Sequence, residues 1–437
     1  MSRLVQPTRI LVVGSGGREH ALAWKLGADP GVNDVYVTLA GTAILAEPRV
    51  HGAAANPLSP TAVVRAARAL AIELVVVGPE APLAAGVADA LIEAGIPVFG
   101  PTAAAARIES SKAFCREIAT AAGVPMASGR AFAAEDHAAA AEYAADLASR
   151  GGVVVKEDGL AAGKGVTVCD SAAEAAAVIA ATNGPLVVEE RLRGREASLI
   201  AICDGRTTLA LPAARDHKRL ADGDRGPNTG GMGAYSPLPD LPGADAEDIV
   251  ERFHRPVLAE LARRGTPFRG ALYAGLMLTD DGPRLLEFNA RFGDPETQVI
   301  LPRLATPLGP LLLAAARGRL EADVEIPVLP GAAVGVVLAS VGYPGEVVPG
   351  ARITALDAGG RLPDAPDVLV FHSGSFHEIG STFLANGGRV LTVVGRGPDL
   401  ATARAAAETA ADRIAWPGMQ RRHDIGIDLP NAVGAAR

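Results

Sequence analysis

The stretch VVKEDGLAAGKGVTVC, residues 154–169, is the part of the sequence that most narrows the choice of fold. A P-loop has the spacing G-x-x-x-x-G-K-[ST] and opens a helix. Here only three residues separate the first glycine from Gly163, and Gly165 stands where the P-loop hydroxyl would be. The β-branched residues that follow favour a strand. We therefore expect a glycine-rich hairpin between strands 153–157 and 165–169.

The tip of this hairpin suits a phosphate ligand. Glycine has no Cβ, so its backbone N–H groups can approach phosphate oxygens closely. Lys156 and Lys164 could add positive charge, and they are two of only five lysines in a chain with 36 arginines. An ordinary hairpin explains the segment equally well, and chance or codon bias explains the lysine count. The loop alone leaves both readings open.

The composition narrows the class of protein. A chain of 437 residues is expected to form two to four domains. The net charge of -8 argues against a nucleic-acid partner. The three cysteines are scattered, without the spacing of a zinc site or a disulfide framework, and no apolar run reaches the roughly 18 residues of a membrane span. We expect a cytoplasmic protein with no signal peptide and no membrane association.

The order of apolar runs predicts an N-terminal α/β region and two further regions. The first hundred residues alternate strand-like and helix-like runs, which is typical of parallel βαβ units with helices on both faces. One helix is expected over 102–123. Long strands after 197, as in EASLIAICDG (196–205) and TTLALPAARDHKR (207–219), predict an antiparallel sheet with a turn at 280–282. It is interrupted by an aperiodic segment at 221–237, and a structureless loop of this length is often functional. The predicted domains are 1–108, 109–330 (a small unit at about 124–197 and a larger one at 198–330) and 331–437.

The segment ILVVGSGGREHA, residues 10–21, places a glycine-rich turn between a strand and a helix. N–H groups at a helix start favour an anion. Dinucleotide binding would need a third glycine at the position of Glu19 and an acidic residue about 20 residues further on. A phosphate or carboxylate site, a tight turn without a ligand, and a nicotinamide site all stay open.

The segment PRLLEFNARFGDPET, residues 283–297, predicts a strand with a polar face. Period-two alternation separates the side chains of 285–291 into two sets. The expected faces are Leu285, Glu287, Asn289 and Arg291 on one side, and Leu286, Phe288 and Ala290 on the other. A carboxylate and an amide oxygen suit magnesium beside nucleotide phosphates, and an arginine could neutralise a transferring phosphoryl group. The alternative is a solvated strand face.

A third segment, PLVVEERLRGREASL at 185–199, ends a predicted strand at Glu189 and Glu190. The exposed backbone of such a strand end can hydrogen-bond the edge of an adenine ring, and a nearby carboxylate can hold ribose hydroxyls. On its own the segment is only an acidic strand end.

Together these motifs resemble the ATP-grasp superfamily and, within it, the glycinamide ribonucleotide synthetase (phosphoribosylamine–glycine ligase) family. The resemblance extends nearly end to end. It rests on the ordered motifs VVGSGGREHALAW, VVGPEAPL, FGPTAAAARIESSKAF, KEDGLAAGKGV, RDHKR, GPNTGGMGAYSP, EFNARFGDPETQ, NGGRVL and GMQRRHDIG. It implies a multidomain α/β and α+β fold: an N-terminal parallel α/β (pre-ATP-grasp) domain, ATP-grasp domains with a hinged lid over ATP, and a small C-terminal α+β domain.

The resemblance also implies roles for individual residues. The residues implied to bind ATP are Lys112, Lys156, Gly163, Lys164 and Gly165 at the phosphates, Glu189, Glu190 and Leu192 at adenine, and Glu196 at the ribose. Glu287 and Asn289 would hold Mg²⁺ or Mn²⁺. Arg291 would face the γ-phosphate, and Arg291 and Lys156 are the expected catalytic residues. The pocket for phosphoribosylamine and glycine is implied to include Gly16, Gly17, Arg18, Pro79, Glu80, Asp216, Lys218, Gly233 and Arg291.

The chain departs from the family pattern in two places. Glu157 stands where an alanine is expected after the lid lysine, beside the like-charged Asp158. The segment TLAGTAI, residues 38–44, replaces an A-P-G-N run, so no substrate contact is carried over there. The residues expected at the catalytic centre are unaffected.

The implied reaction joins glycine to 5-phosphoribosylamine. ATP would phosphorylate the glycine carboxylate, and the amine would attack the glycyl phosphate to give glycinamide ribonucleotide, ADP and phosphate. We expect a monomer that uses these small molecules as partners. The alternatives are another ATP-grasp ligase or carboxylase of the purine pathway, and a nucleotide-binding regulatory protein without turnover.

Overall fold

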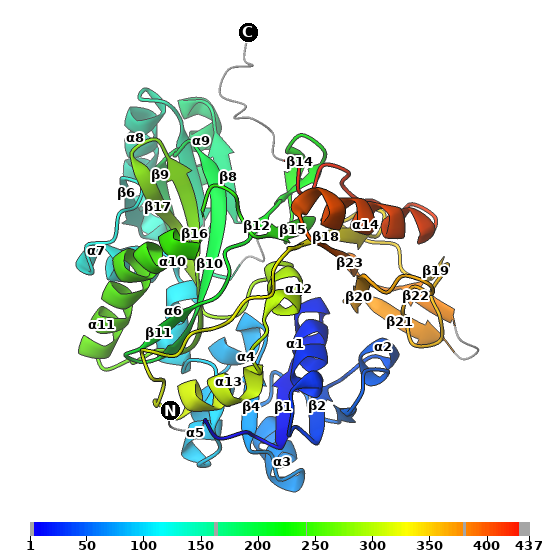
Figure 1. Ribbon diagram of the computed structural model, residues 1–437. Helices are drawn as coiled ribbons and strands as arrows, with labels where there is room; N and C mark the ends of the chain where they lie inside the picture. Colours follow the sequence, from blue (N-terminus) through cyan, green and yellow to red (C-terminus); the bar gives the residue numbers. More distant parts are fainter. Residues whose placement is uncertain (1–3, 161–164, 242, 379–381, 428–437) are drawn as a thin grey trace.

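The computed structural model describes residues 4–160, 165–241, 243–378 and 382–427. The N-terminal part, blue in Figure 1, is a five-stranded parallel sheet in the order β3-β2-β1-β4-β5. Its strands are β1 (Arg9–Val13), β2 (Asp34–Thr38), β3 (Val50–Ala53), β4 (Leu74–Val77) and β5 (Val98–Phe99). The predicted parallel α/β region is confirmed, although β3, with few apolar residues in its sequence VHGA, was not predicted.

Helices cover both faces of this sheet. Leu11 and Val13 of β1 lie in one core cluster with α3 and α5, whereas Ile10 and Val12 lie in a second cluster with α1. Strands buried on both faces need continuous apolar runs, which explains the sequence of β1 and β4. The helices are α1 (Gly17–Ala28), α2 (Thr42–Leu45), α3 (Pro60–Ala69), α4 (Glu80–Ala84) and α5 (Val87–Glu93).

Residues 102–123 form two helices, α6 (Ala103–Ser110) and α7 (Lys112–Ala121), instead of the single helix expected. Ser111 between them is extended, with φ −137° and ψ 114°. The Asp158 carboxylate accepts hydrogen bonds from the first two N–H groups of α7 and from the Ser111 hydroxyl. Such caps satisfy the free N–H groups of a helix start. A contact with a distant segment therefore decides where the helix breaks.

The second unit is a four-stranded antiparallel sheet in the order β6-β9-β7-β8. Helices α8 and α9 share one apolar cluster with β7 and β9. The bounds are β6 (Gly129–Phe132), α8 (His137–Ala148), β7 (Val153–Glu157), β8 (Val166–Cys169), α9 (Ala172–Ala181) and β9 (Leu186–Glu190), with a 3₁₀ turn (Ala134–Asp136) before α8. Pairing of β7 with β8 confirms the expected hairpin; its tip residues 161–164 lie outside the described residues.

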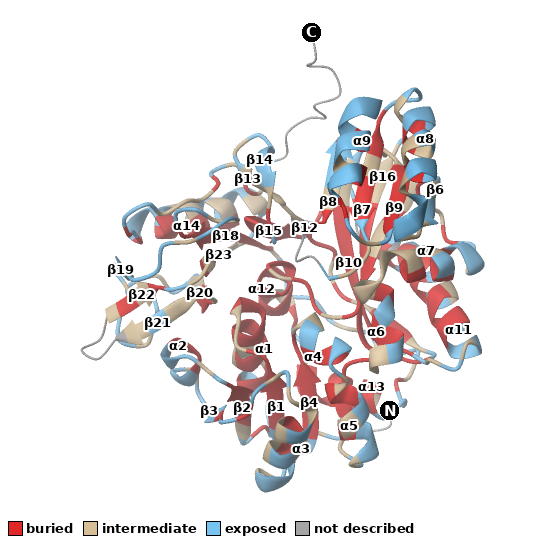
Figure 2. Ribbon diagram, turned by 180° about the vertical axis from the view of Figure 1, so that it is seen from behind, coloured by how far each residue is buried: buried red, intermediate tan, exposed pale blue. Residues whose placement is uncertain are grey.

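The third unit is a four-stranded antiparallel sheet in the order β11-β10-β16-β17. One face of β10 packs with α10, α11 and the π-helical turn between them, and the other face packs partly on α13; Figure 2 shows β10 largely buried. The bounds are β10 (Arg195–Asp204), β11 (Thr208–Ala210), α10 (Gly243–Ile249), the π-turn (Val250–His254), α11 (Arg255–Arg263), β16 (Arg269–Thr279), β17 (Gly282–Asn289) and α13 (Leu308–Ala316).

Strand β17 departs from the strict alternation that its sequence predicted. A β-bulge makes Leu286 an extra residue between Leu285 and Glu287. Leu285 is therefore buried in the core with Phe288, on the face away from Glu287. The expectation that Leu285 belongs to the polar face is wrong. Glu287 and Asn289, which follow the bulge, do share one face.

The last large sheet joins segments from both sides of residue 331. Its order is β12-β15-β18-β23-β20, and helix α14 packs on β18 and β23. A three-stranded sheet, β19-β22-β21, is drawn beside it in orange in Figure 1. The bounds are β12 (Arg215–Asp216), β15 (Gly233–Ser236), β18 (Ala332–Ala339), β19 (Ala351–Ile353), β20 (Val368–His372), β21 (Ser375–Glu378), β22 (Thr382–Ala385), β23 (Arg389–Gly397) and α14 (Leu400–Arg413).

Two expectations about the middle of the chain are wrong. The aperiodic segment 221–237 contains strand β15 and most of a two-stranded ladder between β13 (Arg219–Ala221) and β14 (Arg225–Asn228). The strand expected across 207–219 is divided between β11 and β12, which belong to different sheets. Both errors have one cause: these strands are only two to four residues long, too short for a periodic pattern to show in the sequence.

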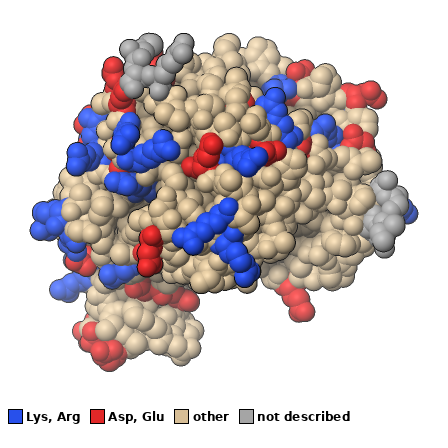
Figure 3. Space-filling view, turned by 90° about the horizontal axis from the view of Figure 1, so that it is seen from below, with Lys and Arg blue, Asp and Glu red and all other residues tan. Residues whose placement is uncertain are grey.

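The surface is of mixed charge on the face seen from below. Figure 3 shows acidic side chains between the basic ones on this face, as is usual for a protein surface. Among the helices of the described residues, none has both the length and the apolar character needed to cross a bilayer.

Candidate active site

One face of the β10–β16–β17 sheet carries the candidate site. Ser198 and Glu287 both lie opposite the same residue of the central strand β16, and Asn289 lies opposite Tyr273. Directly opposite residues project to the same side of a sheet. Glu196, two residues before Ser198, shares that side. The sheet therefore brings the acid predicted for ribose and the two predicted metal ligands onto one surface.

Glu287 and Asn289 form the candidate metal site. Asn289 Nδ2 lies 3.4 Å from Glu287 Oε1. Burial acts to raise the pKa of Glu287, but Lys218, Lys156 and the hydrogen bond from Asn289 outweigh it, and the pKa lies below its ordinary value. An ionised carboxylate and an amide oxygen are ligands that Mg²⁺ accepts when nucleotide phosphates and water complete its coordination. The residues present thus fit a divalent metal shared with a nucleotide.

Lys156 reaches this site from β7. Its Nζ lies 2.6 Å from Glu189 Oε2 and donates a 2.8 Å hydrogen bond to the carbonyl of Leu286, the extra residue of the bulge. Arg116 on α7 pairs with the other oxygen of Glu189 at 2.8 Å. Lys156, which was predicted to contact phosphate, and Glu189, which was predicted to lie at the adenine hinge, therefore form an ion pair, and both residues are buried.

The rest of the predicted adenine hinge lies at the end of β9. Glu190 accepts a hydrogen bond from the Ser128 N–H at 2.7 Å, and Leu192 is partly exposed in the coil that follows. The backbone after β9 is therefore not fully enclosed by the sheet.

Lys112 contacts the base of the β7–β8 hairpin. Lys112 Nζ donates to the Gly159 carbonyl at 2.9 Å, and Asp158 caps the helix that Lys112 begins. The Glu157 N–H donates to the Gly165 carbonyl at 2.8 Å, which closes the lower end of the hairpin. The predicted phosphate contacts Gly163 and Lys164 lie outside the described residues.

Arg291 follows β17 and lies between two carboxylates. Its Nη2 lies 3.1 Å from Glu109 and its Nε 3.5 Å from Glu80. The Arg291 Nη2 also approaches the Asn289 amide oxygen at 3.5 Å. Burial acts to lower the pKa of Arg291, but the two carboxylates overcome it and raise that pKa above its ordinary value. The guanidinium therefore stays charged beside the candidate metal ligands.

The glycine turn at the start of α1 faces the same region from the N-terminal sheet. The Gly16 N–H donates to the Glu19 carboxylate at 2.7 Å, and Arg18 Nη1 donates to the Phe292 carbonyl at 3.0 Å. A Cβ on Gly17 would lie 2.5 Å from Ser373 Oγ, so this glycine permits close approach of the C-terminal part. Pro79 caps α4 at the position before Glu80.

The predicted pocket residues from the middle of the chain divide into two groups. Lys218 pairs with Glu196 at 2.8 Å, and burial raises the pKa of the neighbouring Asp216 to about 7 although Lys218 acts to lower it. Gly233 lies within β15, where a Cβ would meet the Gly335 carbonyl at 2.6 Å. Packing of β15 on β18 explains this glycine without a substrate.

Several residues near the site were not predicted. Glu296, at the start of α12 (Glu296–Ile300), is buried and lies 3.4 Å from Ser198 Oγ, which in turn contacts Tyr273 Oη at 2.7 Å. Arg389 reaches from β23 to Asp294, with an Nη2–Oδ2 distance of 3.0 Å. The motifs EFNARFGDPETQ and NGGRVL contain three of these residues, Asp294, Glu296 and Arg389, but the sequence does not indicate which residues they contact.

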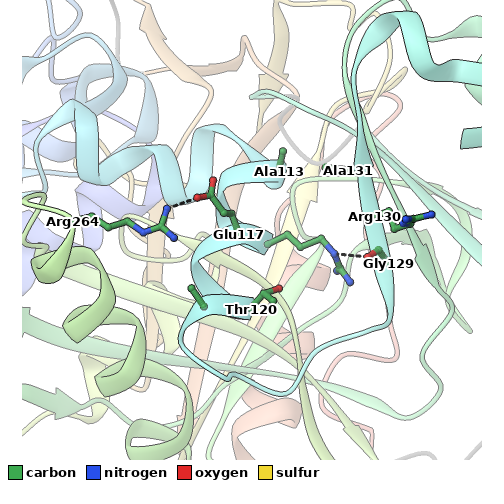
Figure 4. A pocket seen from close by; sticks show the side chains of 9 residues that line it. Ala113, Glu117, Thr120, Gly129, Arg130, Ala131 and Arg264 are labelled. Carbon is green, nitrogen blue, oxygen red and sulfur yellow. Dashed lines mark hydrogen bonds and ion pairs between the residues drawn. The ribbon is translucent and has the colours of Figure 1, made fainter. Parts of the chain in front are cut away.

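Figure 4 shows a separate cavity, of about 470 Å³. It is lined by α7, the start of β6 and Arg264, and includes none of the predicted site residues. Arg116 Nε donates a 3.0 Å hydrogen bond to the Gly129 carbonyl, and Figure 4 shows Arg264 paired with Glu117. These arginines have protein partners, so the cavity adds nothing to the candidate site.

The fold and the polar sheet face define an ATP-grasp protein. A solved structure of similar fold is the biotin carboxylase domain of the Hydrogenobacter thermophilus 2-oxoglutarate carboxylase in complex with MgADP, ADP and bicarbonate. The TM-score is 0.70 at 16% sequence identity, over 95% of this chain and 92% of that one. This likeness concerns the fold alone. The ATP-grasp (A) domain model of phosphoribosylglycinamide synthetase matches residues 110–297.

Two further models complete the match: the phosphoribosylglycinamide synthetase N domain covers residues 8–109 and the C domain residues 333–428. A phosphoribosylamine–glycine ligase of Streptomyces coelicolor is 50% identical over 426 residues, which cover 97% of this chain and 100% of that protein. The chain belongs to the phosphoribosylglycinamide synthetase family.

Other relatives agree with this assignment. The trifunctional purine biosynthetic protein adenosine-3 of Gallus gallus is 43% identical over 431 residues, which cover 96% of this chain and 42% of that protein. The crystal structure of a phosphoribosylamine–glycine ligase from Thermotoga maritima has a TM-score of 0.79 at 32% identity, covering 95% of this chain and 99% of that one. The suspected family and fold class are thereby confirmed.

Proposed function

We propose that this protein joins glycine to 5-phosphoribosylamine at the expense of ATP, giving glycinamide ribonucleotide, ADP and phosphate in purine biosynthesis. Near-complete coverage of relatives named phosphoribosylamine–glycine ligase supports this proposal. The observation that carries it is the convergence of Lys156, Glu287, Asn289 and Arg291 at one end of the sheet, within a chain matched by three domain models of that enzyme.

The chemistry explains why such a site is needed. A carboxylate is a poor acceptor for an amine because oxide is not a leaving group, whereas the phosphate of an acyl phosphate departs readily. Transfer of a phosphoryl group to a carboxylate brings two anions together, so cationic side chains must offset their repulsion. Exclusion of water would protect the acyl phosphate from hydrolysis.

We assign the predicted residues to ATP and metal as follows. A bound divalent metal would offset phosphate charge, and Glu287 and Asn289 would hold it; Mg²⁺ or Mn²⁺ would both suit these ligands. The proposed ATP contacts are Lys112, Lys156, Gly163, Lys164 and Gly165 for phosphates, Glu189, Glu190 and Leu192 for adenine, and Glu196 for ribose. Arg291 and Lys156 are proposed to act on the transferring phosphoryl group.

We assign the remaining predicted residues to glycine and phosphoribosylamine. The proposed contacts are Gly16, Gly17, Arg18, Pro79, Glu80, Asp216, Lys218 and Arg291. The positions of three of these residues support the assignment. Arg18 and Arg291 both donate to the Phe292 carbonyl, and a Glu80 carboxylate oxygen lies 3.5 Å from Arg291 Nε. Gly233 was predicted with this set, but its packing role in β15 is sufficient to explain it.

The broader properties are proposals as well. We propose a cytoplasmic monomer without nucleic-acid or membrane partners, supported by three buried free cysteines and a net charge of -8. We propose domain divisions at 1–108, 109–330 and 331–437, with 124–197 as the small lid unit. The residues matched by the three domain models support these divisions.

A coupled assay tests the proposed function. ATP, Mg²⁺, glycine and freshly made phosphoribosylamine are supplied, and ADP release is measured with each substrate omitted in turn. The proposal predicts ADP release that requires both glycine and the amine. Release supported instead by formate or bicarbonate would favour another ATP-grasp enzyme of the purine pathway, and nucleotide binding without any release would favour a regulatory protein.

A further inference from the structure

We propose that Glu109 is a positioning residue that fixes the direction of the Arg291 guanidinium, and this inference rests on the proposed function. One Glu109 carboxylate oxygen lies 3.1 Å from Arg291 Nη2, and the other accepts a 2.8 Å hydrogen bond from the Ala290 N–H. A single carboxylate thus holds both the side chain and the adjoining backbone. Two attachments to one rigid group leave the guanidinium little freedom to turn.

The second acidic neighbour of Arg291 differs from Glu109 in exposure. The Glu80 side chain is 32% exposed and lies 3.5 Å from Arg291 Nε, a distance at which it makes no hydrogen bond. The Glu109 side chain is 7% exposed and has both oxygens engaged. Glu80 is therefore accessible to a substrate ammonium or hydroxyl. Glu109 is enclosed by protein, so it acts on the reaction through the two groups that it holds, the Arg291 guanidinium and the Ala290 backbone.

The two residues come from different parts of the chain. Glu109 lies on α6, 181 positions before Ala290, and α6 packs directly on β17. Glu109 accepts its backbone hydrogen bond from Ala290, which directly follows Asn289. The same contact therefore fixes the end of β17, the strand that carries both proposed metal ligands. The phosphoryl-transfer site is thus anchored by a helix that lies at the junction of the matched N domain, residues 8–109, and the matched ATP-grasp domain, residues 110–297.

A carboxylate is needed at this position for a physical reason. A glutamine could still accept the Ala290 N–H through its amide oxygen, but its other terminal group would be an NH₂ facing a guanidinium, and neither can accept. The variant Glu109→Gln would therefore keep the backbone hydrogen bond and release Arg291. Loss of orientation at a reacting group is expected to lower kcat, by about 10 to 100-fold for a displacement near 1 Å, and to leave the KM for ATP within about twofold.

The experiment is a double-mutant cycle in the full chain, with steady-state kcat measured for wild type, Glu109→Gln, Arg291→Lys and the double variant. Arg291→Lys keeps a cation but removes the planar group that a carboxylate can orient. The control is Asp29→Asn, which removes another buried carboxylate that accepts a backbone N–H, from Gly309 at 2.7 Å, away from the site. Melting temperatures are recorded for all variants.

The proposal predicts that Glu109→Gln lowers kcat at least tenfold in the wild type and less than threefold in Arg291→Lys, while Asp29→Asn loses stability without this change in kcat. Equal factors in both backgrounds, or a lower melting temperature with unchanged kcat per folded molecule, would overturn it. If Glu109→Gln does not fold, the same cycle is measured with Glu109→Asp. The aspartate side chain is one methylene shorter, so its carboxylate lies further from Arg291. A wild type that makes no glycinamide ribonucleotide refutes the proposed function instead.

Discussion

Lys156 and Glu189 form a 2.6 Å ion pair in which the two side chains are 10% and 8% exposed. The pair joins the β7–β8 hairpin to the strand that ends at the proposed adenine hinge. Arg116 on α7 pairs with the other oxygen of Glu189, so one carboxylate faces two cations. Because buried charges are stable only when paired, each member of this group fixes the position of the others.

Lys156→Ala is expected to raise the KM for ATP by about tenfold or more, since a hydrogen bond to a charged group contributes about 1.5–3 kcal/mol. The melting temperature should fall as well, because Glu189 would keep Arg116 as its one remaining ionic partner among the described residues. Initial-rate kinetics over a range of ATP concentrations measure the first effect. Lys25→Ala, whose ammonium donates to the Leu304 carbonyl, is the control; an unchanged KM in Lys156→Ala refutes the phosphate assignment.

Glu287→Gln should reduce turnover by about 100-fold or more while the protein stays folded, because an amide is a much poorer ligand than a carboxylate for a hard cation. The measurement is kcat across a magnesium titration, with Glu73→Gln as the exposed control; Glu73 accepts the Thr8 N–H far from the site. Activity that recovers to the wild-type level at saturating magnesium would remove Glu287 from the metal site.

Asp216→Asn is expected to change how stability depends on pH. Burial raises the Asp216 pKa from 3.8 to about 7, so between these values the folded protein holds a proton that the unfolded chain releases. The contribution of Asp216 to the free energy of unfolding is therefore fully present below about pH 4 and is lost as the pH rises to about 7. Lys218, Glu296, Glu196 and His217 are the charged neighbours that modulate it.

The asparagine variant lacks this titration. Its melting temperature relative to wild type should be higher at pH 8 than at pH 5, and its activity should be lower at both. Thermal melts of the two proteins at the two pH values test the prediction. The same melting-temperature difference at both pH values would show that Asp216 titrates normally.

Gly395→Ala should destabilise the C-terminal sheet. A Cβ at this position would lie 2.3 Å from both the Ala403 carbonyl and the Ala407 nitrogen, so α14 would have to move away from β23. Overpacking of this kind costs about 1–3 kcal/mol. Urea denaturation compares the variant with Gly243→Ala, where a Cβ meets nothing within 4 Å. Equal stability of the two variants would contradict the close packing.

The sequence predicts those strands and turns that are determined by residues close together in the chain. The parallel N-terminal sheet follows from buried apolar runs, and the β7–β8 hairpin follows from β-branched residues on either side of a glycine-rich turn. The shared face of Glu287 and Asn289 was also predictable, because the two residues follow the bulge and alternate regularly.

The errors occur where distant segments decide the outcome. The helix expected over 102–123 breaks because Asp158, 46 residues after Lys112, caps the second part. Leu285 changes face because the partner strand imposes a bulge at Leu286. Glu109 lies within the motif FGPTAAAARIESSKAF, but nothing in the sequence near it indicates its partners Ala290 and Arg291, which lie more than 180 residues away. Periodicity and turn signals within a short stretch of sequence cannot predict contacts between residues that lie so far apart in the chain.

We propose that a glycyl phosphate forms at the site of Lys156, Glu287 and Arg291. Glycine labelled with oxygen-18 in its carboxylate tests this directly, because the carboxylate oxygen that attacks the γ-phosphorus leaves with the phosphate when the amine displaces it. Mass spectrometry of the released phosphate should show one oxygen-18 atom per molecule of glycinamide ribonucleotide. Unlabelled phosphate, formed together with glycinamide ribonucleotide, would show that the reaction does not pass through a glycyl phosphate.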